Sequence, residues 1–367
     1  MVDPRIKKWA DLLVQYSNEV QPGEWCLVQA PVVALPLVRE LYRAILEAGG
    51  HPTVRLSDGE MQNIFFNAAN DDQLDWVSPV SKLTMENADC MFTIWGSDNT
   101  RALSHVDPAR MARAQASQRE LFTTFLKRMA EKEVKWIGTQ FPTQAHAQEA
   151  EMSLSEYEEF VLSAMLLHTD DPVAEWRKVS ARQQAKVDWL KGKKQVTVKS
   201  ANADLSLSIE GRIFDNAAGR ENMPDGEIYT SPVEDSVNGW VRFTYPAIYN
   251  GRSVEGVELH FEQGKIVKAT ASKNEDFLKS QLTVDAGASY LGEFAIGTNF
   301  GIKDYTGEIL YDEKIGGTFH VAVGAGFPEL GGKNESAVHW DMICDMRQGG
   351  EIHVDGELFY KDGDFVV

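Results

Sequence analysis

The hydrophobic pattern of the chain changes near residue 194, and this change most constrains the fold. Before it, strand-like apolar runs at residues 25–34, 51–56, 88–95 and 134–138 alternate with stretches of helical spacing. After it, short alternating segments such as Val257-Glu-Leu-His-Phe261 are separated by Gly, Asn and Asp. For a chain of 367 residues, we therefore expect two domains. Residues 1–194 would form an α/β domain with a mostly parallel sheet, and residues 195–367 a β-rich α+β domain.

Helical spacing marks the connections between the strands of the first half. Leu37, Leu41 and Ile45 predict a helix that ends at Gly49-Gly50, and residues 107–132 predict a second one. Ser155-x-x-Glu158 is interpreted as a capping box for a helix to about Leu167. A further helix is predicted by the spacing of Trp176, Val179, Val187 and Leu190. No GxxxxGK[ST] or HExxH motif occurs, and no GxGxxG stands at a strand-to-helix turn. The sheet therefore carries no visible nucleotide-binding signature.

The charge of the chain excludes one class of partner. Lys+Arg number 36 against 55 Asp+Glu, a formal net charge of −19. Such a field repels phosphate backbones, so we expect no nucleic-acid partner. The three cysteines, Cys26, Cys90 and Cys344, lie far apart without CxxC spacing, which argues against a disulfide framework or a thiolate zinc site. Since no window suits a membrane span or a signal peptide, we predict a cytoplasmic protein with no membrane partner.

The segment SAVHWDMICD, residues 336–345, interrupts an apolar run with a histidine and an aspartate. In a strand, the even-numbered residues from Val338 to Cys344 share one face, and the odd-numbered residues from His339 to Asp345 share the other. The first face suits a core. The second presents His339 and Asp341 pointing the same way, as two ligands of one metal ion would. For this motif alone, a solvated polar pair stays an alternative.

Four further acids and imidazoles stand in strand-like contexts of the second half: Glu227 after the turn PDG, Glu293 in YLGEFAIGTN, and Glu313 and His320 in DEKIGGTFHVAVG. A carboxylate inside an apolar run is costly to bury unless it is paired or bound to a metal. Taken singly, each could be a turn residue, part of an ion pair or a core histidine. Taken together with His339 and Asp341, they form a mixed oxygen and nitrogen set suited to zinc, manganese or cobalt.

A second H-x-D motif, His353-Val354-Asp355, has a different context. Asp355-Gly356 is a strong hairpin-turn dipeptide. The aspartate is therefore expected to serve the turn, and this pair is expected to be structural.

The order of NMPDGEIYTSP, LGEFAIGTN, DEKIGGTFHVAVG and GGKNESAVHWDM resembles the thermophilic metalloprotease family of aminopeptidases, peptidase family M29. The resemblance spans the second half, and the first half agrees in length and α/β character. It places the β-rich domain's metal ligands at Glu227, Glu293, Glu313, His320, His339 and Asp341. It also implies two divalent ions per chain, peptide substrates and a homodimer.

The resemblance implies a metal-dependent aminopeptidase that releases N-terminal amino acids by attack of an activated water. Two zinc, cobalt or manganese ions would share Glu293, and Glu293 or Glu313 would carry the proton to the departing amine. Asp345, on the strand face of His339 and Asp341, and Phe327 are expected beside the ligands or the substrate.

Phe327 departs from the family pattern, because it stands where the family usually has a tyrosine that assists catalysis. Phenylalanine has no hydroxyl to donate to a developing oxyanion, and the loss of such a donor costs on the order of a hundredfold or more in rate. This departure motivates one alternative, a catalytically weak peptide-binding relative.

A second alternative is a mononuclear iron dioxygenase that cleaves dihydroxypyridine rings, because two histidines and one carboxylate are enough for its facial triad. The additional acids Glu227 and Glu313 favour the two-metal interpretation, since one iron does not need them.

Overall fold

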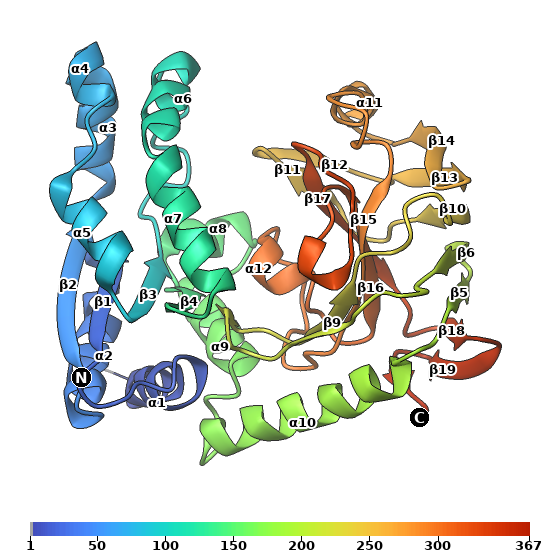
Figure 1. Ribbon diagram of the computed structural model, residues 1–367, viewed down its shortest axis with the longest axis horizontal. Coiled ribbons are helices and arrows are strands. Elements are labelled where there is room, and N and C mark those ends of the chain that lie inside the picture. Colours follow the sequence, from blue (N-terminus) through green and yellow to red (C-terminus); the bar gives the residue numbers. More distant parts are fainter. Residues whose placement is uncertain (1–2) are drawn as a thin grey trace. The chain divides into compact units, whose positions relative to one another are not determined.

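The computed structural model describes residues 3–367 and divides into two compact units. The first unit runs to Trp176 and includes Gly219–Pro224; the second comprises Arg177–Ala218 and Asp225–Val367. Figure 1 shows their helices and strands. Whether the chain also has a boundary between independently folding domains at residue 194 stays a prediction.

The first unit is built on a parallel sheet with the strand order β2-β1-β3-β4-β8. Every strand pair in it is parallel, as expected for strands separated by helices. The strands are β1 Trp25–Pro31, β2 His51–Ser57, β3 Cys90–Trp95, β4 Lys135–Gln140 and β8 Asn222–Met223. The α-helices are α1 Arg5–Leu12, α2 Leu35–Glu47, α3 Gly59–Ala68, α4 Asp71–Leu74, α5 Pro79–Asn87, α6 Pro108–Ser117, α7 Arg119–Ala130, α8 Gln144–Glu149 and α9 Leu154–Ala164. The α/β character predicted for the first half is confirmed.

Two helix predictions differ locally from the structure. The helix predicted over residues 107–132 is two helices, α6 and α7, that meet at Gln118. The capping box of α9 pairs Ser153 with Glu156, not Ser155 with Glu158. The sequence SLSEYE contains two overlapping S-x-x-E matches, and Ser153 has the extended backbone of an N-cap, whereas Ser155 already lies in the first turn.

The second unit is β-rich and mainly antiparallel. An eight-stranded sheet has the order β14-β13-β10-β6-β5-β18-β19-β20, a five-stranded sheet the order β17-β16-β15-β9-β7, and β11 pairs with β12. The strands are β5 Gln195–Ser200, β6 Ala203–Ser208, β7 Asp215–Ala217, β9 Glu227–Thr230, β10 Asn238–Arg242, β11 Ala247–Tyr249, β12 Arg252–Val254, β13 Glu258–Glu262, β14 Lys265–Thr270, β15 Leu291–Gly297, β16 Thr318–Gly324, β17 His339–Asp345, β18 Glu351–Val354, β19 Glu357–Lys361 and β20 Asp364–Phe365. The α-helices are α10 Pro172–Leu190, which begins in the first unit, α11 Glu275–Gln281 and α12 Ile309–Asp312.

The five-stranded sheet separates a core face from a polar face, as the alternation in residues 338–345 predicts. Val338, Trp340, Met342 and Cys344 are buried in the core of the second unit. His339 and Asp341 lie on the opposite face of β17, and Asp341 pairs in register with Ala322 of β16. The small neighbour leaves space above the sheet at the point where the polar side chains gather.

The second H-x-D motif serves a turn, as expected. Asp355 and Gly356 both have positive φ angles, of 51° and 83°, between β18 and β19. The Asp355 carboxylate accepts a hydrogen bond from the backbone N–H of Gln195 at 2.9 Å. Among the described residues, no helix combines the length and the hydropathy needed to cross a membrane.

Candidate metal centre

Four adjacent strands and one helix end bring the six predicted ligands together. In the sheet order, β17, β16, β15 and β9 are consecutive neighbours. Glu227 opens β9, Glu293 lies in β15, His320 lies in β16, and His339 and Asp341 lie in β17, whereas Glu313 directly follows α12.

The ligand atoms form three overlapping groups, and within each group they lie within 4.8 Å of one another: Glu227, Glu293 and His320; Glu293, His339 and Asp341; Glu313, His320 and Asp341. Glu293 connects the two histidines. Its Oε1 lies 3.7 Å from Nε2 of His320, and its Oε2 lies 3.2 Å from Nε2 of His339. One carboxylate therefore faces both imidazoles with different oxygens.

Several polar atoms in this cluster are buried without a hydrogen-bond partner, which is costly unless a cation occupies the space between them. They are Oε2 of Glu227, Nε2 of His320 and Oδ1 of Asp341. Nδ1 of His320 also has no partner, but the geometry of the ring directs it away from the carboxylates that Nε2 faces. Nε2 of His320 lies 3.2 Å from Oε2 of Glu227, but the two atoms are not aligned for a hydrogen bond. The donor set of carboxylate oxygens and imidazoles fits divalent zinc, manganese or cobalt.

His339 is oriented as metal-binding histidines usually are. Its Nδ1 lies 2.9 Å from the carbonyl oxygen of Ala325, to which it can donate a proton. This bond fixes the ring and directs Nε2 toward Glu293 and Asp341.

The cluster holds protons when no cation is present. Burial disfavours charged imidazoles, but the neighbouring carboxylates outweigh it: they raise the pKa of His339 to about 10 and that of His320 well above its usual value. Burial also works against ionised Glu293, yet the two imidazoles lower its pKa to about 2. Burial raises the pKa of Glu313 to about 8. Divalent cations would take the place of these imidazole protons, so cation binding and protonation compete.

Lys314 is a further member of the cluster that sequence reasoning missed. Next to Glu313 in DEKIGG, it suggests a surface charge pair, but its side chain is only 1 % exposed. Its ammonium contacts Oε1 of Glu313, lies 3.3 Å from Oε1 of Glu227 and lies 4.0 Å from Oδ1 of Asp225. Lys314 thus engages one oxygen of each of two predicted ligands, and their other oxygens can face the cluster.

Comparison with known proteins agrees with the resemblance. The sequence profile of the thermophilic metalloprotease (M29) family matches residues 2–365. The chain belongs to this family. It is therefore an enzyme of the metalloprotease class, a hydrolase, and the family implies a divalent metal.

Named relatives of this M29 protein match over nearly its whole length. "Aminopeptidase 2" of Geobacillus stearothermophilus is 27% identical, and the match covers 98% of this chain and 95% of that relative. "Aminopeptidase T" of Thermus thermophilus is also 27% identical, with the same two shares.

Two solved structures share the fold of the M29 protein. AmpT from Thermus thermophilus superposes with a TM-score of 0.85 at 24% identity and covers 99% of both chains. A 2,5-dihydroxypyridine dioxygenase from Pseudomonas putida gives a TM-score of 0.56 at 14% identity, over 99% of this chain and 97% of that one. The fold class predicted from the sequence is confirmed.

The two remaining predicted site residues have different surroundings. The ring of Phe327 lies edge-on to His339, 5.4 Å between ring centres, and to Tyr229, 5.0 Å away. Phe327 therefore borders the cluster. The Asp345 carboxylate lies 2.6 Å from the Arg347 guanidinium, and it belongs to none of the three ligand groups found among the described residues. Its contact with a substrate stays a prediction.

Proposed function

We propose that this M29 protein is an aminopeptidase that uses two metal ions to release N-terminal amino acids from peptides. The observation that carries the proposal is the position of Glu293, with one oxygen toward each imidazole and membership in two ligand groups. A carboxylate in this position can be shared by two cations. The names of the relatives support N-terminal cleavage.

The charge of the cluster supports two divalent cations. Five carboxylates gather there, namely Glu227, Glu293, Glu313, Asp341 and Asp225, against the single ammonium of Lys314. With all five acids ionised and the imidazoles neutral, the cluster has a formal excess of four negative charges, which two divalent cations would balance. With a single iron, protons would have to neutralise the surplus acids, as burial favours for Glu313, whose pKa it raises to about 8. This surplus of acids favours two zinc, cobalt or manganese ions over the mononuclear dioxygenase.

The residues of the cluster have different proposed roles in metal binding and proton transfer. When bound, the two cations would polarise the scissile carbonyl and acidify a water. Glu227, His320, His339 and Asp341 would hold the cations, together with Glu293, which belongs to two of the ligand groups. Glu313 is better placed than Glu293 to carry the proton, because both oxygens of Glu293 face imidazoles. The Glu313 side chain is partly exposed, and the burial of the rest of it raises its pKa to about 8, near neutral pH.

Elemental analysis combined with peptide cleavage tests the proposal. We expect two equivalents of zinc, cobalt or manganese per chain, and hydrolysis of Leu-, Phe- or Lys-nitroanilide that a chelator abolishes and added metal restores. N-acetyl-Leu-nitroanilide is the matched control, since its blocked amine should prevent cleavage. A single oxygen-sensitive iron would favour the dioxygenase. No turnover of any nitroanilide by metal-loaded protein would favour a peptide-binding role.

Phe327→Tyr is expected to raise kcat, by up to about a hundredfold if the missing phenol limits the reaction. The Phe327 ring borders His339, so a hydroxyl on this ring would lie near the proposed centre. Steady-state kinetics with Leu-nitroanilide measures the effect, and metal content shows that the site is intact. An unchanged or lower rate in a folded, metal-loaded variant contradicts the idea.

We also propose that the protein is a homodimer, as the family resemblance implies. Supporting this, large apolar side chains are exposed on helices of the first unit: Met61 and Ile64 of α3, Val80 and Leu83 of α5, and Phe122 of α7. Burial of these side chains against a second copy of the chain would remove their apolar surface from water. Light scattering should give twice the chain mass of 41.0 kDa, and a mass of one chain at micromolar concentration rejects the dimer. A cytoplasmic location stays a prediction.

A further inference from the structure

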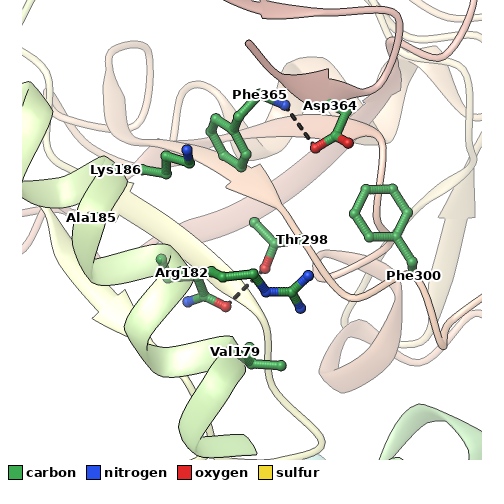
Figure 2. A pocket seen from close by; sticks show the side chains of 9 residues that line it. Val179, Arg182, Ala185, Lys186, Thr298, Phe300, Asp364 and Phe365 are labelled. Carbon is green, nitrogen blue, oxygen red and sulfur yellow. Dashed lines mark hydrogen bonds between the residues drawn. The ribbon is translucent and has the colours of Figure 1, made fainter. Parts of the chain in front are cut away.

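The second unit contains a cavity of about 330 Å³ that the proposed catalytic cluster does not use. Its lining, drawn in Figure 2, consists of Val179, Arg182, Gln183, Ala185 and Lys186 of α10, Thr298 and Phe300 after β15, and Asp364 and Phe365 of β20. The volume lies at the small end of the range for ligand sites in proteins. It suits a molecule the size of an amino acid.

The cavity is cationic, which is unusual in a chain with a net charge of −19. Arg182 and Lys186 stand one helical turn apart on α10. Arg182 forms no ion pair with any residue that the structure describes. The Lys186 ammonium contacts the carbonyl oxygen of Val367 and lies 5.7 Å from the ring centre of Phe365. The one acid of the lining, Asp364, accepts a hydrogen bond from the backbone N–H of Phe365 at 2.8 Å.

The cavity also offers apolar contact. Phe300 is 54% exposed, which is costly for a phenyl ring unless it meets a ligand or a partner. In Figure 2 the rings of Phe300 and Phe365 lie on different sides of Thr298; the Lys186 side chain lies beside Phe365, and the Arg182 side chain extends toward the side of Phe300. A guanidinium without an ion-pair partner among the described residues, in a cavity lined by two phenyl rings, suits a carboxylate that carries an apolar group.

One wall of the cavity is fixed by buried hydrogen bonds to the strand that carries Glu227. The Gln183 side-chain amide donates to the carbonyl oxygen of Glu227 at 2.8 Å, and its Oε1 accepts from the Thr298 hydroxyl at 2.9 Å. The backbone N–H of Thr298 donates to the carbonyl oxygen of Gly226 at 2.8 Å. The wall is therefore preformed, and Gln183 connects the cavity to the backbone of Glu227, a proposed metal ligand.

We propose that this cavity binds a small carboxylate with an apolar side group, and that its ligand is a free apolar α-amino acid. The carboxylate would pair with Arg182, whose guanidinium has no ion-pair partner among the described residues. The side chain would pack on Phe300 and Phe365, and the ammonium would face Asp364. The existence of the site follows from the cavity itself. The choice of an amino acid rests on the proposed function, because such amino acids are its products.

Calorimetric titration of the full chain, stripped of metal by a chelator, tests the proposal apart from catalysis. L-phenylalanine should bind one equivalent per chain, and L-phenylalaninamide, which lacks the carboxylate, should bind at least about tenfold more weakly. N-acetyl-L-phenylalanine, which lacks the ammonium, should also bind more weakly. Undiminished binding of this acetylated form would overturn the amino-acid assignment.

Variants of two exposed arginines on α10 locate the site. Arg182→Gln should weaken L-phenylalanine binding at least about tenfold, whereas Arg177→Gln, which changes an arginine outside the lining, should leave it unchanged. No binding to the wild-type chain at millimolar ligand, or equal binding by Arg182→Gln, would overturn the proposal. Because no peptide is hydrolysed in this titration, its failure is distinguishable from a failure of the proposed aminopeptidase activity.

Discussion

His320→Ala is expected to reduce bound metal below two ions per chain and to abolish nitroanilide hydrolysis. His320 is fully buried and belongs to two of the three ligand groups, so its loss removes a donor that no neighbour can replace without moving the sheet. Removing a group that merely supports a metal ligand already weakens metal binding by about 10–100-fold. Loss of a ligand itself should exceed this range.

His353→Ala is the matched control for His320→Ala. His353 belongs to the other H-x-D motif, is partly exposed in β18 and is absent from the ligand groups of the described chain. Elemental analysis after gel filtration and steady-state kinetics should both match the wild type. If His320→Ala instead retains two metal ions and the wild-type kinetics, His320 is not a ligand and the proposed centre fails.

Lys314→Met is expected to lower the Tm of the metal-free protein by about 10 °C, and that of the metal-loaded protein by much less. Removing one partner of a buried ion pair costs about 3–5 kcal/mol, and each kcal/mol lowers the Tm of a domain of this size by about 2–4 °C. In the metal-free protein, Lys314 is the ammonium that lies closest to Glu227, Glu313 and Asp225. Bound divalent cations neutralise the same carboxylates, so the variant should recover more stability on metal addition than the wild type does.

Thermal unfolding of the wild type and of Lys314→Met, each with and without zinc, measures how far metal binding replaces the stabilising effect of Lys314. Lys273→Met is the matched control, because Lys273 forms a comparable ion pair with Glu255 but its side chain is 57% exposed. Its Tm should change by no more than a few degrees. An equal loss of Tm in the metal-free and metal-loaded forms of Lys314→Met would mean that Lys314 stabilises the fold without acting on the metal centre.

The position of the candidate site was predictable because strand alternation places the proposed ligands on one face. In residues 338–345, the two-residue period separates the Trp340 face from the His339 face, and the structure has the same division. A costly carboxylate in an apolar run likewise drew attention to Glu293. The sequence could not show that Lys314 is buried, because its letters alone do not distinguish a surface ion pair from a buried one. The position of Asp225 in the cluster was not predictable for the same reason, since it depends on where the Lys314 ammonium lies.

Sequence patterns did not predict two features of the fold. One depends on a choice between two similar capping motifs, and the other depends on the pairing of strands that lie far apart in the sequence. Two overlapping capping motifs precede α9, and only the backbone at Ser153 decides between them. The short strand β8 has too few residues to show any period. Its pairing with β4 joins residues more than eighty positions apart and depends on tertiary structure.

The return of β8 to the first unit has a consequence for how the polypeptide can be divided. A fragment that stops at residue 194 lacks the strand that accompanies β4, where Gly138 pairs with Asn222 and the Thr139 hydroxyl bonds to the carbonyl oxygen of Met223 at 2.6 Å. The unprotected edge of such a fragment would expose backbone donors and acceptors that favour association with other chains. During synthesis, this sheet gains its final strand only when Met223 is available, four residues before the first acidic ligand of the proposed centre.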